Sequence, residues 1–308
     1  GPFWLRQSVQ AINEKSGKIY FTAMKESSVE RHLYSVDLSG KNIEKISKEK
    51  GVHSIGCSPN GEYYFDKFSD SSTPPKLSLH SISGEVVKII DKPKLDLIID
   101  MELQTPELFT IPTSDGFPMP AQILKPADFD ETKEYPLIYH VYGGPSAPTV
   151  FDSWQGSSLL YDNILLRNGY LVVRFDHRSA TAISKTLENR VHLMISGPIE
   201  MEDIVDGIQW LKSKGYVDPN RVGIWGWSGG GSFTLNAMTN TSEFKAGISG
   251  APVTDWHYYD TKWGEFAMRR PQDNPEGYEK TSFVKSAKNL NGRLLLIHGT
   301  YDDNVHPQ

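Results

Sequence analysis

A glycine-rich segment, residues 226–231 (Gly-Trp-Ser-Gly-Gly-Gly), has the residue types and spacing that most clearly predict chemistry in this chain. It follows an apolar run and contains the pattern G-x-S-x-G, which is typical of a sharp strand-to-helix turn that exposes a serine hydroxyl above a sheet. Such a turn needs small neighbours, because the helix passes close to the strand. We therefore predict that Ser228 is a nucleophile for acyl transfer, and a glycine-rich turn with a serine N-cap is the alternative.

A serine hydroxyl is a weak nucleophile, so it needs a general base, a carboxylate that orients this base, and donors for the oxyanion. In enzymes with this turn the residues follow the order Ser, Asp, His along the chain. Asp302 lies just past the C-terminal end of a predicted strand and is the candidate carboxylate, with turn formation as the alternative role. His306 follows it too closely to bridge Asp302 and Ser228. We therefore expect the base beyond residue 308, and we expect the isolated 308-residue chain to be inactive.

Two groups are candidates for the oxyanion hole. The first is the backbone N–H of Gly229, which follows the nucleophile at a predicted helix N-terminus. The second is the phenol of Tyr142, which comes after a predicted strand and before a pair of glycines. These glycines, Gly143 and Gly144, permit the tight turn that would bring the phenol toward the serine.

The elements that must position these residues alternate between strand and helix from about residue 105 onward. Two segments around Ser114 predict a hairpin, and residues 199–214 carry apolar residues at helical spacing. Unbroken apolar strands separated by helices predict an α/β domain with a mostly parallel sheet that is covered on both faces. The predicted strands are residues 107–111, 119–124, 137–142, 171–175, 222–225, 246–249 and 293–298.

The first part of the chain has a different pattern, with short strands at regular spacing and a tight-turn signal, Ser-Pro-Asn-Gly, at residues 58–61. About seven or eight strands correspond to two four-stranded blades of a β-propeller. We predict domains at residues 1–95 and 96–308, with a hinge near residues 92–94. The clearest strands are residues 18–23, 31–38, 52–57, 62–66 and 76–82.

Composition places the chain among ordinary globular proteins, with 38% hydrophobic and 23% charged residues. A net charge of −6 without a block of Lys or Arg argues against a nucleic-acid partner. Cys57 is the only cysteine, which excludes an internal disulfide and a cysteine-based metal site. No apolar stretch is long enough to span a bilayer, and no signal peptide is visible. We expect neither a cofactor nor a metal.

Three separated motifs, in this order, resemble the prolyl oligopeptidase family of serine peptidases, and most of all its dipeptidyl-peptidase IV branch. They are residues 135–145, which contain Val-Tyr-Gly-Gly-Pro, residues 224–228 (Ile-Trp-Gly-Trp-Ser), and residues 298–306 (His-Gly-Thr-Tyr-Asp-Asp-Asn-Val-His). The strand-rich first part resembles the end of that branch's propeller. The resemblance implies an α/β-hydrolase fold, without its last strand and helix in these 308 residues, preceded by propeller blades.

The resemblance also implies roles for individual residues. Ser228 would be the nucleophile, and Asp302 would orient the missing histidine. Tyr142 and Gly229 would form the oxyanion hole, and Asn304 would hold the carbonyl of the substrate's penultimate residue. A flat pyrrolidine ring is held well by aromatic walls, although an ordinary aromatic core is the alternative for this cluster. The implied walls of the proline pocket are Val253, Trp256, Tyr259, Trp263 and Val305.

The chain departs from the family pattern at two places. Gly229 stands where the branch often has Tyr, so we expect a pocket that is wider or that is shaped by Trp263. Residues 176–181 (Asp-His-Arg-Ser-Ala-Thr) contain fewer glycines than the family's loop and predict a different loop path. The paired glutamates that bind the substrate's amino terminus in the family belong to an earlier propeller region. Release of dipeptides rather than tripeptides therefore rests on the resemblance alone.

The leading interpretation is a serine peptidase that releases short N-terminal peptides, most simply dipeptides, after Pro or Ala through an acyl-enzyme. Two alternatives stay open: an acylaminoacyl peptidase or esterase of the same fold, and a non-catalytic binding protein on this scaffold. A binding protein has no need of a strained serine turn, which favours the enzyme. The resemblance favours peptide substrates with a free N-terminus and a periplasmic or secreted location, and it allows a homodimer.

Overall fold

The structure of the chain is a computed structural model, which describes residues 9–93 and 95–308. By compactness the chain divides into two units, Gly1–Pro106 with Phe151–Asn163, and Glu107–Val150 with Ile164–Gln308. The hinge predicted at residues 92–94 lies partly outside the described residues. The domain boundary predicted after residue 95 stays a prediction.

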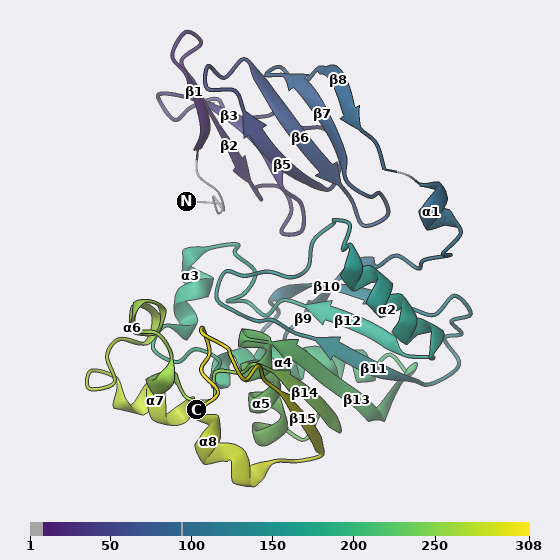
Figure 1. The fold of residues 1–308 in the computed structure, drawn as a ribbon, viewed down its shortest axis with the longest axis vertical. Helices are drawn as coiled ribbons and strands as arrows, with labels where there is room; N and C mark the ends of the chain where they lie inside the picture. Colours follow the sequence, from purple (N-terminus) through teal and green to yellow (C-terminus); the bar gives the residue numbers. More distant parts are fainter. Residues whose placement is uncertain (1–8, 94) are drawn as a thin grey trace. The chain divides into compact units, whose positions relative to one another are not determined.

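The first unit contains two four-stranded antiparallel sheets in which strands that follow one another in sequence are paired (Figure 1). Such meandering sheets are the building block of a propeller, and the predicted all-β first part of the chain is confirmed. One sheet consists of β1 (Val9–Asn13), β2 (Lys18–Ala23), β3 (His32–Asp37) and β4 (Glu44–Lys45). The other consists of β5 (Val52–Cys57), β6 (Tyr63–Ser69), β7 (Lys76–Ser81) and β8 (Val86–Asp91).

The predicted turn at residues 58–61 joins β5 and β6. The hydroxyl of Ser58 accepts hydrogen bonds from the backbone N–H groups of Glu62 (3.2 Å) and Tyr63 (3.1 Å). Gly61 has a φ of 61°, which explains why glycine ends the turn. The short polar side chain and the glycine therefore set the register of this hairpin locally.

The second unit is built around a seven-stranded sheet in the order β15-β14-β13-β11-β12-β10-β9. β9 and β10 form the predicted antiparallel hairpin, and the neighbours from β12 to β15 run parallel. The predicted α/β architecture is therefore confirmed. The strands are β9 (Glu107–Pro112), β10 (Pro118–Leu124), β11 (Tyr135–His140), β12 (Leu171–Phe175), β13 (Val217–Trp227), β14 (Ala246–Gly250) and β15 (Arg293–Ile297).

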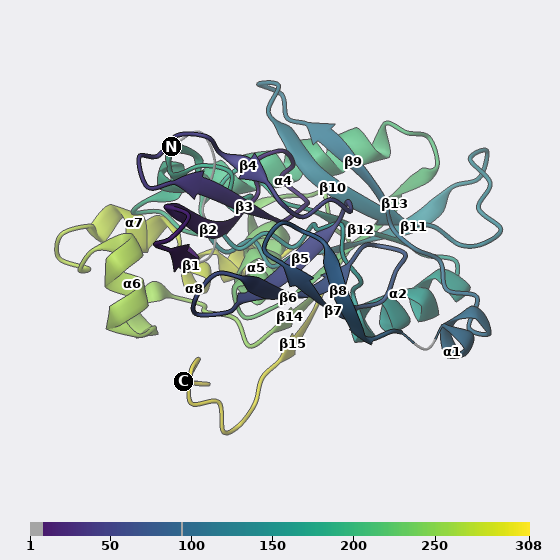
Figure 2. The same cartoon turned by 90° about the horizontal axis from the view of Figure 1, so that it is seen from above.

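The helices of the chain lie mostly between these strands in sequence. They are α1 (Asp96–Ile99), α2 (Ser157–Arg167), α3 (Lys185–Glu188), α4 (Pro198–Lys212), α5 (Gly229–Asn240), α6 (Thr261–Met268), α7 (Pro275–Lys280) and α8 (Phe283–Ser286). Figures 1 and 2 both place α6 and α7 side by side. A hydrogen bond of 2.7 Å from the hydroxyl of Tyr278, in α7, to the carbonyl of Arg269 agrees with this placement.

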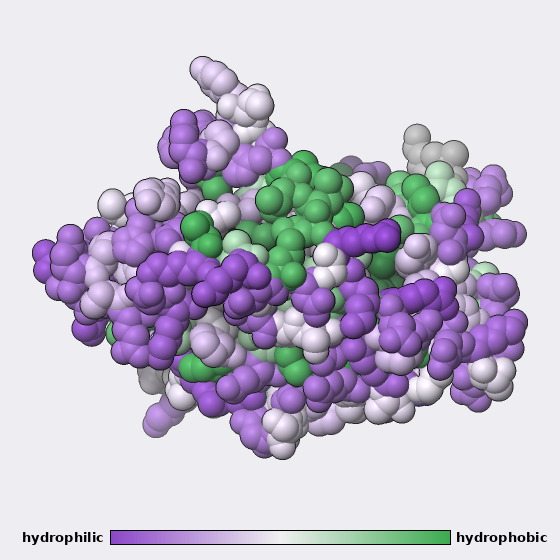
Figure 3. Space-filling model, turned by 90° about the horizontal axis from the view of Figure 1, so that it is seen from below, coloured by the Kyte–Doolittle hydropathy of each residue, from purple (hydrophilic) through white to green (hydrophobic). Residues whose placement is uncertain are grey.

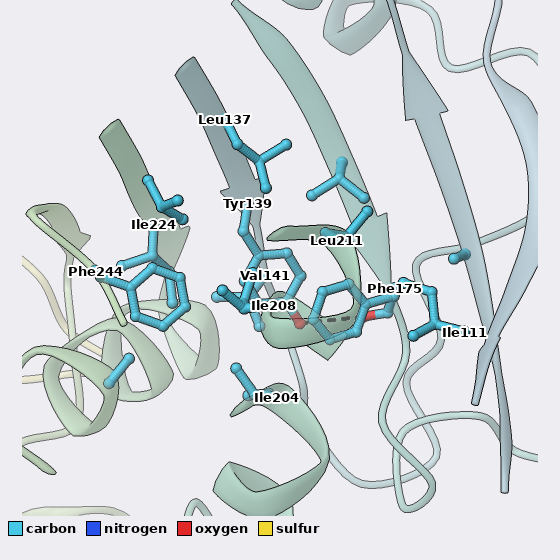
Figure 4. Close-up of a cluster of buried hydrophobic side chains, with 14 of the residues drawn as sticks. Ile111, Leu137, Tyr139, Val141, Phe175, Ile204, Ile208, Leu211, Ile224 and Phe244 are labelled. Carbon is cyan, nitrogen blue, oxygen red and sulfur yellow. Dashed lines mark hydrogen bonds between the residues drawn. The ribbon is translucent and has the colours of Figure 1, made fainter. Parts of the chain in front are cut away.

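The core of the second unit lies where α4 and α5 pack against one face of the sheet (Figure 4). Alternate residues of β11, Leu137 and Tyr139, point into this core, as the period of two in a strand requires. The ring of Tyr139 stacks on Phe175 with 4.2 Å between centroids, and its hydroxyl donates to the Phe175 carbonyl oxygen at 3.1 Å. Ile204 and Ile208, one helical turn apart on α4, close the cluster. This packing fixes the carboxyl ends of β11 and β13, from which the site is built.

β15 forms one edge of the sheet within the described part of the chain. Its side chains Leu295 and Leu296 are 53% and 58% exposed, and Ile248 of the neighbouring β14 is 41% exposed. An apolar area is visible on the lower face of the molecule in Figure 3. The loop that follows β15 extends away from this edge (Figure 2).

Candidate active site

The turn at residues 226–231, here called the elbow, places Ser228 between the end of β13 and the start of α5. Ser228 has a φ of 56° and a ψ of −118°, a backbone conformation that residues other than glycine rarely adopt. Its backbone N–H donates to the carbonyl oxygen of Gly250 at 2.8 Å, and its carbonyl accepts from Ser232 at 3.0 Å. The surrounding sheet and helix therefore hold the strained residue in place, with its side chain only partly buried.

Three of the four glycines of the elbow are required by close backbone contacts. A Cβ atom on Gly226 or Gly230 would collide with the carbonyl oxygen of Val141, and one on Gly231 would collide with the carbonyl oxygen of Gly250. Gly229 differs, because a Cβ atom there would touch only Tyr142, at 3.5 Å or more. The fold therefore does not demand glycine at position 229, although it does at the other three positions.

A small pocket of about 100 Å³ opens beside Ser228. It brings together the predicted nucleophile, both predicted oxyanion donors and four of the five predicted pocket walls. The pocket is lined by Tyr142, Gly144, Pro145, Ile195, Ser196, Ser228, Gly229, Phe233, Val253, Trp256, Tyr259 and Trp263.

The aromatic walls of this pocket form one cluster. The ring centroids of Trp256 and Trp263 lie 5.2 Å apart, with an angle of 31° between the ring planes. The ring of Tyr259 meets both of them edge-on, with 5.8 Å between centroids in each case. Asp260 fixes part of this wall, because its carboxylate caps α6 and accepts the N–H of Trp263 at 2.9 Å. The indole N–H of Trp256 donates to the carbonyl of Ile195 at 3.3 Å. The rings are thus anchored at several points and present flat, rigid faces to the pocket.

Tyr142 reaches the pocket from the loop after β11. The preceding residue, Val141, donates its backbone N–H to the carbonyl of Trp225 in β13 at 3.0 Å. Gly143 has a φ of 76°, and a Cβ atom there would meet the ring of Phe233 at 2.6 Å, so glycine is needed. The side chain of Tyr142 is 42% exposed, which leaves its phenol accessible to a bound substrate.

The loop after β15, residues 298–306, is here called the Asp302 loop. The Oδ1 atom of Asp302 accepts the backbone N–H groups of Val305 (2.9 Å) and Asn304 (3.1 Å). These bonds, that of Val305 first, hold the pKa of the Asp302 carboxyl below its usual value. The carboxylate is therefore ionised at neutral pH, as orientation of a histidine base requires.

The contacts of His298 lie within the Asp302 loop and do not involve Ser228. Its Nε2 atom lies 2.7 Å from the carbonyl oxygen of Val305 and 3.6 Å from Oδ2 of Asp302. The side chain of His306 is exposed. The predicted position of the base beyond residue 308 stays a prediction.

Two further predicted residues connect the Asp302 loop to the pocket. Val305 is 7% exposed and packs in one cluster with Val253 and Trp256. The amide oxygen of Asn304 accepts a hydrogen bond from the hydroxyl of Tyr259 at 3.4 Å. The loop is therefore attached to the aromatic wall at two points.

Sequence reasoning missed an ionic network around the buried Arg178 that supports the Tyr142 loop. The guanidinium of Arg178 is bound by Asp203 of α4 at 2.6 Å and by Asp115 of the β9–β10 hairpin at 2.8 Å. These carboxylates raise the pKa of Arg178, and Arg178 in turn holds the pKa of Asp115 well below its usual value. Beside them, the carbonyl of Ser179 accepts the N–H of Ser146 at 2.8 Å. The network therefore links the loop after β12 to the loop that carries Tyr142.

A signal for part of this network was present in the sequence. Glu200, Asp203 and Gly207 recur at helical spacing on the buried face of α4, where apolar residues are expected. Glu200 is fully buried, which raises the pKa of its carboxyl well above the usual value, and its Oε2 accepts the N–H of Gly197 at 2.7 Å. Buried acids on an amphipathic helix indicate a partner such as Arg178. The pocket residues Ile195 and Ser196 belong to no motif and had no such signal.

Within residues 9–93 and 95–308, no group of three or more His, Cys, Asp or Glu side chains is arranged to hold a metal ion. In the same part of the chain, none of the helices is both long and apolar enough to cross a membrane.

Comparison with known proteins finds a matching family model in each part of the chain. Residues 158–308 match the model of the prolyl oligopeptidase family, and residues 3–75 match that of the dipeptidyl peptidase IV N-terminal region. A probable dipeptidyl-aminopeptidase B of Arthroderma gypseum is 35% identical over 305 residues, covering 96% of this chain and 33% of that protein. The chain thus spans about a third of the length of such curated relatives.

Two solved structures are similar over nearly the whole chain. Dipeptidyl peptidase 4 of Porphyromonas gingivalis has a TM-score of 0.93 at 30% identity, covering 99% of this chain and 43% of that one. A putative dipeptidyl aminopeptidase IV of Bacteroides ovatus has a TM-score of 0.87 at 32% identity, covering 100% of this chain and 44% of that one.

Proposed function

Because the chain belongs to the prolyl oligopeptidase family, we propose that it carries the nucleophile and the specificity pocket of a serine dipeptidyl peptidase. The enzyme releases dipeptides from free N-termini after Pro or Ala through an acyl-enzyme. The observation that carries this proposal is the strained backbone of Ser228, which lines a small pocket with rigid aromatic walls.

The proposed reaction begins with attack of the Ser228 hydroxyl oxygen on the carbonyl carbon of the scissile bond. A histidine base, which the family pattern implies and Asp302 would orient, takes the hydroxyl proton and later gives it to the departing amine. The phenol of Tyr142 and the N–H of Gly229 donate to the oxyanion of the tetrahedral intermediate. Water then attacks the ester on Ser228 and releases the dipeptide.

The size and walls of the pocket support a preference for Pro or Ala before the scissile bond. A volume of about 100 Å³ is well below that of pockets that hold drug-sized ligands, which are roughly 300 Å³ or more, so a compact side chain fits it best. The pyrrolidine ring is flat and rigid, and it packs against Trp256 and Trp263 at little entropic cost.

Asn304 supports the orientation of the preceding residue. Its amide oxygen already accepts from Tyr259, so its Nδ2 group is the part that can donate to a substrate carbonyl. A second anchor of this kind fixes the peptide along the pocket before Ser228 attacks.

The test is hydrolysis of Gly-Pro-p-nitroanilide and of its N-acetylated form by the protein at its native length, beside the Ser228→Ala variant. We expect cleavage of the free-amine substrate only, with a loss of about 10⁴-fold or more in the variant. Cleavage of the acetylated substrate would instead support an acylaminoacyl peptidase or endopeptidase. No cleavage of either substrate would support a non-catalytic protein on this scaffold.

A further inference from the structure

A second, larger pocket adjoins the one beside Ser228. It has a volume of about 340 Å³, and it shares three walls with the smaller pocket: Pro145, Ile195 and Trp263. Phe266 of α6 adds another aromatic wall, and Glu188 of α3 adds a carboxylate. The volume suits a long side chain, whereas the proposed Pro or Ala would leave this pocket unused.

Glu188 lines this second pocket and has a buried carboxylate oxygen without a hydrogen-bond partner among the described residues. Its side chain is 18% exposed, and Oε1 lies 3.1 Å from the Nζ atom of Lys185. Its Oε2 atom is buried and has no hydrogen-bond partner among the described residues. A buried carboxylate oxygen without a donor is costly, and a ligand that brings an N–H group would remove this cost.

Gly229 adds no side chain to the wall of the small pocket beside Ser228. Since a Cβ atom at this position would meet only ordinary contacts with Tyr142, the missing side chain is not a demand of the elbow. Its absence keeps open the side of the small pocket next to the nucleophile. A substrate side chain longer than that of proline can therefore occupy space that a residue with a side chain would fill.

We propose that this site also accepts substrates whose residue before the scissile bond has a long side chain ending in an N–H donor, such as Lys. The aliphatic stem lies along Trp263 and Phe266, and the terminal ammonium pairs with the carboxylate of Glu188, whose Oε2 has no hydrogen-bond partner of its own. The proposal rests on the proposed function, because attack by Ser228 is what defines this substrate position.

The test uses the p-nitroanilides of four dipeptides with a free amino terminus, with the protein at its native length. The dipeptides are Gly-Pro, Gly-Ala, Gly-Lys and Gly-norleucine. Norleucine matches the lysine stem but has no ammonium group. We expect the wild-type kcat/KM for Gly-Lys to lie within about tenfold of that for Gly-Ala and about tenfold above that for Gly-norleucine.

Two variants separate the parts of the proposal. Glu188→Gln should lower the ratio of Lys to norleucine cleavage about tenfold, since a charge-assisted hydrogen bond is lost. Gly229→Leu should lower the ratio of norleucine to Ala cleavage by about tenfold, because the leucine side chain fills space in the small pocket beside Ser228. Ratios within one variant cancel any general loss at the oxyanion hole. Glu276→Gln, at an exposed acid of α7 that pairs with Lys280, is the matched control and should leave both ratios unchanged.

The outcomes distinguish this inference from the proposed function. Cleavage of Gly-Pro and Gly-Ala without preference for Lys over norleucine overturns the inference and leaves the proposed function standing. An unchanged ratio in Glu188→Gln also overturns it, since Glu188 would then not recognise the side chain. If none of the four substrates is cleaved, both the proposed function and the inference fail.

Discussion

The elbow is held by its own backbone, whereas the Asp302 loop is held mainly by side chains. At the elbow, three glycines pass so close to neighbouring carbonyl groups that no other residue fits. In the Asp302 loop, the fixed points are one carboxylate, one imidazole and the buried Val305, and most of the loop is exposed. A change at the elbow should therefore affect folding first, and a change in the loop should affect activity first.

The largest expected effect is on activity, in the Asp302→Ala variant. In the proposed mechanism, the histidine base loses its orienting partner without this carboxylate, and we expect kcat/KM of the protein at its native length for Gly-Pro-p-nitroanilide to fall about 10⁴-fold. Thermal unfolding should shift little, because the two lost hydrogen bonds lie in an exposed loop. Asp303→Ala, at the exposed neighbour, is the control and should keep wild-type activity. A variant of Asp302 that keeps activity would remove this residue from the proposed triad.

The next effect is on stability, in the Gly230→Ala variant. Its methyl group would overlap the carbonyl oxygen of Val141, so helix α5 must move away from β11. We expect a loss of about 3 kcal/mol in the free energy of unfolding, measured by urea denaturation, or failure to fold.

Gly229→Ala is the matched control for this change. It adds the same methyl group one residue earlier, where the nearest atoms are 3.5 Å away, and it should change stability by less than about 1 kcal/mol. Equal losses in the two variants would contradict the idea that backbone collisions hold the elbow.

The same difference explains what the sequence could predict. The elbow, the strands of the sheet and the two four-stranded sheets follow from local patterns: glycine spacing, apolar runs and turn residues. Ser228 and Tyr142 could be predicted to lie close together because both follow strand ends at one edge of the sheet, whereas the aromatic walls were implied by the family resemblance.

Contacts that depend on distant segments could not be predicted in this way. Ile195 lines the pocket, and its carbonyl accepts a hydrogen bond from Trp256 across 61 positions in the sequence. The ion pair of Arg178 with Asp115 likewise joins a loop and a hairpin that no motif connects. The depth of the pocket toward Glu188 is a property of tertiary packing, and a single sequence carries no period or spacing that reports it.

A third prediction concerns two carboxyls whose pKa values are shifted in opposite directions. Burial raises the pKa of Glu200, so the folded state keeps a proton that the unfolded state releases above about pH 4.3. Its contribution to stability is therefore lost as the pH rises. Glu200→Gln stays neutral and keeps an acceptor for Gly197, so its stability advantage over the wild type should grow as the pH rises from 4 to 7.

Asp302 should show the reverse dependence. Its pKa is lowered by the N–H groups of Val305 and Asn304, so its stabilising effect is present above about pH 3.9 and disappears as the pH falls through its folded value. Urea denaturation of the wild type, Glu200→Gln and Asp302→Asn measures both effects, between pH 4 and pH 7 for Glu200 and below about pH 3.9 for Asp302. Stability curves that run parallel at all pH values would contradict the assignment of Glu200 as a neutral buried acid.

The smallest effect tests the strain stored at the nucleophile. The φ of 56° and ψ of −118° at Ser228 suit glycine, because they correspond to the first central position of a type II′ turn. The cost of holding serine there is about 1–3 kcal/mol, and glycine would relieve it while making the unfolded chain more flexible by about 0.4–1 kcal/mol. Ser228→Gly should therefore be more stable than the wild type by about 1 kcal/mol in urea denaturation.

Ser228→Ala separates strain from the loss of the hydroxyl. Alanine keeps the Cβ atom and therefore the strain, so its stability should match that of the wild type, although both variants lose the nucleophile. If glycine brings no gain over alanine, the backbone at Ser228 carries no measurable strain. The serine would then be held at the elbow at no cost, and the strained turn would no longer favour an enzyme over a binding protein.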